Sequence, residues 1–180
     1  LLGRYQNETK ELPRDTTIFV GNVTAARECV RHLEHQPDFN RIWHPNYSGE
    51  EKKYVQRFND LVNSSNSFAC VDIHNNTGKN PHYGVIAAKD PRHLQLATLF
   101  NRTAVYSTVP DTSLFVNLHS TLPTITLECG LSGENLGVEH AENFLDACLH
   151  LEEIPNHWPH YSDIDLYQTV ARILIPNEIN

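Results

Sequence analysis

One stretch, residues 68–78, constrains the fold of this chain more than any other. It reads Phe-Ala-Cys-Val-Asp-Ile-His, followed by Asn-Asn-Thr-Gly. The first part is typical of a buried β-strand, and the second is a polar loop that contains a glycine. Asp72 and His74 are two residues apart, so on a strand their side chains share one face. A histidine at such a strand end can be a metal ligand or a hydrogen-bonded structural residue, and the stretch alone leaves both open.

The composition is that of a globular protein and excludes several kinds of partner. Of the 180 residues, 39% are hydrophobic and 20% are charged. The formal net charge of −8 disfavours binding to nucleic acids or to anionic membranes. No apolar run is long enough to cross a bilayer. The four cysteines are widely spread and form no Cys-x-x-Cys pair, so we expect a reducing, cytoplasmic environment.

Strand patterns alternate with helix patterns along the sequence. Apolar and β-branched runs predict strands at residues 16–20, 68–74, 84–88, 103–107 and 124–129. Caps and 3.6-residue stripes predict helices at 24–33, from Ser48 to about 62, at 91–100 and at 138–149. Residues 108–123 show no periodicity and are expected to form a loop. This order favours an α/β architecture with a central, mostly buried mixed sheet flanked by helices.

A domain boundary is predicted near residue 160, because residues 155–163 carry two prolines and several polar turn formers. We therefore divide the chain into an α/β domain, 1–160, and the beginning of a β-rich second domain, 161–180. The sequence has no methionine, and Leu1-Leu2-Gly3 resembles the tail of a helix. The chain is thus expected to be a fragment that lacks residues at both ends.

Polar residues stand at three other informative places. Arg31 is at the end of the predicted first helix, and Asn40-Arg41 lies in a loop bounded by prolines. Glu128 lies inside the apolar run 124–129, where burial disfavours the ionised carboxylate unless a cation or a metal is near. Taken alone, Glu128 is as consistent with an internal salt bridge as with catalysis.

Taken in order, these elements resemble the succinylglutamate desuccinylase/aspartoacylase family of the zinc carboxypeptidase-like superfamily. The resemblance covers about residues 16–150 and rests on Gly21-Asn22, Arg31, Asp38 to Ile42, Asp72 to Asn75 and Thr126 to Gly130. It implies that residues 1–160 form a zinc carboxypeptidase-like catalytic domain.

In that family one zinc ion per subunit is held by a His-x-x-Glu pair and a later histidine, to which His74 corresponds. The pair is absent here and is expected before residue 1, so the fragment alone is expected to be inactive. By the same resemblance Glu128 is the general base and Arg31 stabilises the oxyanion. Asn40 and Arg41 would bind a substrate carboxylate. Asp72 would orient His74, or act in a cap or a salt bridge.

The implied function is zinc-dependent hydrolysis of the amide bond of an N-acylated amino acid, a small-molecule substrate. The alternatives are a metallocarboxypeptidase acting on a peptide C-terminus and a non-catalytic binding relative. Aspartoacylases have a further arginine shortly before the catalytic glutamate, whereas residues 103–127 contain neither Arg nor Lys, which argues against N-acetylaspartate. His119 is the nearest basic candidate, and the 76–83 loop, with Lys79 and His82, could shape the acyl pocket.

The sequence leaves the oligomeric state open. The remaining histidines are expected on the solvated surface rather than in a second metal site, among them His140, His150, His157 and His160.

Overall fold

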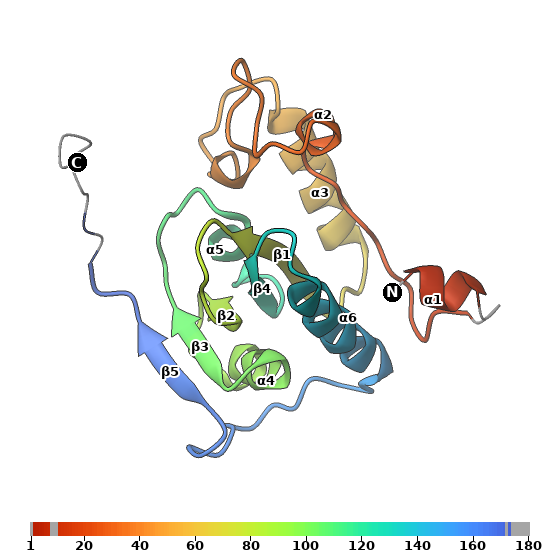
Figure 1. Cartoon of the computed structure of the whole chain (residues 1–180), viewed down its shortest axis with the longest axis vertical. Coiled ribbons are helices and arrows are strands. Elements are labelled where there is room, and N and C mark those ends of the chain that lie inside the picture. Colours follow the sequence, from red (N-terminus) through yellow and green to blue (C-terminus); the bar gives the residue numbers. More distant parts are fainter. Residues whose placement is uncertain (1, 8–10, 172, 174–180) are drawn as a thin grey trace.

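A five-stranded mixed sheet forms the centre of the computed structural model, which describes residues 2–7, 11–171 and 173 (Figure 1). The strand order is β1-β4-β2-β3-β5. β4 is parallel to β1 and antiparallel to β2, while β2, β3 and β5 run parallel to one another. The predicted α/β class with a central mixed sheet is therefore confirmed. The strands are β1 (Cys70–Asn76), β2 (Tyr83–Ile86), β3 (Thr103–Tyr106), β4 (Thr124–Leu131) and β5 (Asp165–Gln168).

Helices cover both faces of this sheet (Figure 1). On one face α4 and α6 enclose a core that includes Ile125 and Leu127 of β4, both fully buried. On the other face Phe115 of α5 packs against Val85 of β2, and α3 packs beside α5. The helices are α1 (Leu2–Asn7), α2 (Val23–Arg27), the 3-10 helix η1 (Phe39–Arg41), α3 (Lys52–Ser64), α4 (Pro91–Phe100), α5 (Leu114–Leu118) and α6 (Asn135–His150). None of the helices in the described residues is long and apolar enough to cross a membrane.

The segment before α3 differs from the prediction. Residues 16–20 form no strand, and Ile18 and Val20 are 59% and 56% exposed. Only Phe19 turns inward, where its ring packs edge-on against Trp43 and Phe58. The β-branched composition predicted a strand, but a strand needs a neighbour to pair with, and here two aromatic contacts of Phe19 hold the segment instead.

The helix predicted at 24–33 is also shorter in the structure. Asn22 caps α2 by accepting a hydrogen bond from the Ala25 amide at 3.0 Å. The helix ends at Arg27, because Cys29 has a left-handed backbone with φ 55°. Arg31 therefore lies in a turn rather than at a helix end.

The remaining predicted elements between residues 48 and 150 are present, with shifted ends. Pro91 is the first residue of α4, as the sequence indicates, and Asp90 caps this helix. α5 was not predicted, because five residues are too few to show a helical period. In the predicted second domain, β5 pairs with β3 of the central sheet. The later strand candidates there, such as Ile175, lie outside the described residues, so the prediction of a β-rich second domain stays a prediction.

A close helix–strand contact fixes the end of β4. Gly137 of α6 is buried against the carbonyl group of Cys129, the residue after Glu128. A β-carbon at position 137 would overlap the Cys129 carbonyl oxygen. Glycine is therefore what allows α6 to approach the strand that carries the candidate site.

We predict that Gly137→Ala lowers the free energy of unfolding by about 3 kcal/mol, because the backbone of β4 or α6 must move to remove the overlap. Val138→Ala, at the exposed next position, should change it by less than about 0.5 kcal/mol. Urea unfolding followed by circular dichroism measures both. Equal stability of the two variants would contradict the contact.

Candidate functional site

The pairing of β1, β4 and β2 places a histidine, a carboxylate and a tyrosine in one row across the sheet. His74 is the register partner of Glu128, and Glu128 is the register partner of Tyr83. Directly opposite residues share a face, so all three side chains lie on the face covered by α3 and α5. Two of the three, His74 and Glu128, are residues for which the sequence predicts a role.

His74 lies between two carboxylates. Its Nε2 atom is 3.0 Å from Oδ2 of Asp72, and its Nδ1 atom is 3.9 Å from Oε1 of Glu128. Burial lowers the pKa of His74, but Asp72 and Glu128 outweigh burial and the opposing charge of Arg31, so the pKa is raised above its usual value. Asp72 thus holds one ring nitrogen, while the other faces Glu128.

Glu128 is mostly buried beside this histidine. Burial raises the pKa of its carboxyl group, and the charge of Asp72 adds to this, while His74 and Arg31 act in the opposite direction. The net shift is upward. Within the described residues Glu128 has no direct ion pair with an arginine, and its charged neighbour is His74 at 3.9 Å.

The predicted substrate-binding residues are held together by Asp38, for which no role was predicted. Its Oδ2 atom accepts hydrogen bonds from Nε and Nη2 of Arg31 at 3.0 and 2.8 Å, and its Oδ1 atom accepts one from the Asn40 amide at 2.9 Å. Burial raises the pKa of Asp38, but the Asn40 amide, Arg31 and Arg41 outweigh it and lower the pKa below its usual value. Asp38 therefore joins Arg31 to the Asn40-Arg41 pair.

The sequence did not predict a role for two further polar groups near the site. The hydroxyl of Thr126 and the side-chain nitrogen of Asn76 are buried and have no hydrogen-bond partner among the described residues. Thr126 is 2% exposed and is the register partner of Asp72. Its position two residues before Glu128 could have indicated the shared face, but its lack of a partner depends on packing that a sequence does not show.

The histidines of uncertain role lie elsewhere. His82 and His140 form an Nδ1 to Nδ1 hydrogen bond of 2.7 Å, and His140 Nε2 donates to the Phe100 carbonyl at 2.7 Å. The expectation of a solvated surface position is therefore wrong for His140, which stacks on the Phe100 ring. His119 follows α5, where its Nδ1 atom donates a hydrogen bond to the Val116 carbonyl at 2.6 Å. Lys79 is exposed.

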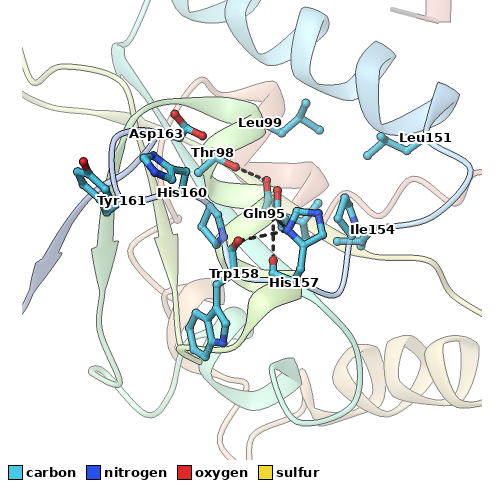
Figure 2. A pocket seen from close by; sticks show the side chains of 13 residues that line it. Gln95, Thr98, Leu99, Leu151, Ile154, His157, Trp158, His160, Tyr161 and Asp163 are labelled. Atoms are coloured by element: carbon cyan, nitrogen blue, oxygen red, sulfur yellow. Dashed lines mark hydrogen bonds between the residues drawn. The ribbon is translucent and has the colours of Figure 1, made fainter.

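One cavity lies away from this row of residues. It has a volume of about 930 Å³ and separates α4 from the segment 151–163 that leads to β5 (Figure 2). Gln95 lines this cavity, and its side-chain amide donates a hydrogen bond to the His157 carbonyl at 2.9 Å. His157 and His160 border this cavity, whereas none of the predicted site residues does. The row of candidate residues thus lies on the opposite side of the sheet from this cavity.

The described residues fit one ligand of a metal site but not a complete set. Asp72 engages Nε2 of His74 and leaves Nδ1 available, which is the arrangement of a carboxylate that orients a metal-bound imidazole. No group of three His, Cys, Asp or Glu within the described residues could hold a metal ion. Any further ligands would have to come from elsewhere in the protein.

Comparison with known proteins bears on the fold. The sequence matches no protein-family model and no curated protein sequence. Solved structures match at low identity over most of the chain. A succinylglutamate desuccinylase from Chromobacterium violaceum is 14% identical over 86% of the chain, with a TM-score of 0.64. The corresponding enzyme from Vibrio parahaemolyticus is 12% identical over 86%, with a TM-score of 0.61. Murine aminoacylase 3 is 17% identical over 82%, with a TM-score of 0.56.

The chain has the succinylglutamate desuccinylase fold. This confirms, at the level of the fold, the resemblance stated from the sequence. The chain spans 58%, 51% and 57% of the lengths of these three proteins, respectively. At such identities the desuccinylase fold is what is shared, and the chemistry has to be argued from the side chains.

The role of Asp38 leads to a prediction. Because its folded pKa is lowered, ionised Asp38 contributes stability above the usual carboxyl pKa of about 4, and that contribution is lost as the pH falls through the lower folded value. Asp38→Asn should therefore lower the free energy of unfolding by about 1 kcal/mol at pH 7, a modest value because Arg31 is largely exposed.

Urea unfolding between about pH 7 and pH 3.5 tests this, since the difference from wild type should shrink below about pH 4. Asp60→Asn on the exposed surface of α3 is the matched control and should show no such pH dependence. A constant difference across the range would contradict the assignment of an ionised Asp38.

Proposed function

We propose that this protein is a zinc-dependent hydrolase that cleaves the amide bond of an N-acylated amino acid. The observation that carries the proposal is the placement of Asp72, His74 and Glu128 on adjacent strands, in a fold shared with desuccinylases and an aminoacylase. All four cysteines are unpaired, which supports our further proposal of a cytoplasmic location.

His74 is the proposed metal ligand within this chain. Asp72 fixes the ring orientation and the tautomer by holding Nε2, so that Nδ1 carries the lone pair. A bound zinc ion would polarise the amide carbonyl group and lower the pKa of a bound water molecule. The other two ligands, a His-x-x-Glu pair, are proposed to precede residue 1.

Glu128 is the proposed general base. Its Oε1 atom lies 3.9 Å from Nδ1 of His74, so one substrate molecule can contact both groups. The carboxylate can accept a proton from an attacking water molecule and later donate it to the leaving amine. Partial burial supports this exchange, because it reduces competing hydration of the carboxylate.

The cations of the site have a proposed role in binding and charge stabilisation. Arg31 is held by two hydrogen bonds to Asp38, and its charge acts on both His74 and Glu128. A fixed guanidinium at this place can stabilise a developing oxyanion. Asn40 and Arg41, tied to the same carboxylate, would bind the carboxylate of the amino acid.

Glu128→Gln tests the assignment of the base. In the full-length protein we expect zinc to remain bound, because Gln keeps the shape of the side chain, and kcat to fall by about 10²- to 10⁴-fold. Metal content measured by mass spectrometry and turnover measured by amine release give the two readouts. Glu134→Gln, an exposed glutamate six residues later, is the control and should retain turnover. Retained turnover in Glu128→Gln would remove Glu128 as the base.

A substrate panel separates the proposed function from its alternatives. We expect the full-length protein to hydrolyse N-acyl amino acids and to leave peptides with a free C-terminus intact. Preference for peptides would favour a metallocarboxypeptidase, since Asn40 and Arg41 could also bind a C-terminal carboxylate. Binding of either class without turnover in the zinc-loaded protein would indicate a non-catalytic relative. Amine release by each substrate class is the measurement.

A further inference from the structure

Tyr83 stands next to Glu128 on the side away from His74. It is the register partner of Glu128 in the antiparallel pair of β2 and β4, whereas His74 is its partner in the parallel pair of β1 and β4. The ring of Tyr83 is partly buried in an apolar cluster with Val85 and Phe115. The phenol is thus held at a fixed place on the face that carries the candidate site.

The hydroxyl group of Tyr83 is uncommitted within the part of the chain that the structure describes. No residue there hydrogen-bonds to it, and it does not pair with the neighbouring carboxylate. Burial raises the pKa of Tyr83, and the negative charge of Glu128 raises it further, so the phenol is neutral. A neutral phenol offers a hydrogen-bond donor to whatever lies over Glu128.

The two sides of Glu128 differ in charge. Asp38 joins Arg31 to the Asn40 amide, and the charge of Arg31 acts on His74 and on Glu128. Tyr83 instead packs in the apolar cluster, and the charge that acts on it is that of Glu128. A substrate carboxylate is therefore favoured on the side of Arg31, where Asn40 and Arg41 join the same network. The other end of an N-acyl amino acid, its acyl group, is left facing Tyr83.

We propose that Tyr83 contacts the substrate and selects its acyl group, through a hydrogen bond donated by its hydroxyl. This inference rests on the proposed function and adds a substrate class to it. The surroundings of Tyr83 are apolar, and the nearest charge is negative. A second carboxylate on the acyl group would be desolvated there beside Glu128, which is unfavourable. An uncharged acyl group such as acetyl is therefore preferred over succinyl.

Tyr83→Phe in the full-length, zinc-loaded protein tests this, because it removes the hydroxyl and keeps the ring. For an N-acetyl amino acid we expect kcat/KM to fall about tenfold, the usual size for one lost hydrogen bond to a substrate. Binding of the same compound to the Glu128→Gln protein, measured by calorimetry, should weaken about tenfold when Tyr83→Phe is added. Tyr167→Phe on the exposed strand β5 is the control and should change neither value.

The wild-type protein should also hydrolyse the N-acetyl form of an amino acid faster than its N-succinyl form. Turnover that is lost in Glu128→Gln but unchanged in Tyr83→Phe would overturn this inference and leave the proposed function intact. A preference for the succinyl form would do the same. If the protein neither hydrolyses nor binds any N-acyl amino acid, this inference and the proposed function are both overturned. A lower thermal midpoint for Tyr83→Phe, with both kinetic and binding values unchanged, would show a structural role only and would also overturn it.

Discussion

The geometry of the candidate site depends on the burial of one face of β4. Ile125 and Leu127 are fully buried against α4 and α6, and the residues between and after them, Thr126 and Glu128, must therefore face the opposite way. A slip of one residue would place Glu128 in the apolar core and move the isoleucine and the leucine to the face that carries the candidate site. The hydrophobic effect on one side of the strand thus fixes the position of the carboxylate on the other.

A different kind of interaction holds the cationic half of the site. Arg31, Asn40 and Arg41 lie in a segment with little regular structure, so backbone pairing does not fix them. The segment is anchored by Phe19 and Trp43, whose rings pack together with that of Phe58. Asp38 then supplies the local order through hydrogen bonds to Arg31 and to the Asn40 amide. The carboxylate half is thus held by strand pairing, and the arginine half by side-chain contacts.

The sequence was informative where structure is determined locally. The apolar run before His74, the carboxylate inside residues 124–129 and the helix that begins at Pro91 all reflect nearest neighbours, and each is present as predicted. The prediction of a strand at residues 16–20 was wrong, because strand pairing depends on distant residues. Tyr83 was missed for the same reason, since only the antiparallel pairing of β2 with β4 brings it beside Glu128. Local sequence patterns do not predict roles that depend on the register between distant strands.

The charges explain why the two ends of a substrate would be treated differently. Asp72 and Glu128 place two carboxylates around one imidazole, and the only arginine that acts on both His74 and Glu128 within the described residues is already paired with Asp38. The surroundings of His74 therefore carry excess negative charge. This charge favours a cation at Nδ1 of His74 and disfavours an anionic group near Tyr83. In the proposed function an anionic end of the substrate is stabilised by Arg31 and Arg41, so the charge distribution favours one orientation of an N-acyl amino acid.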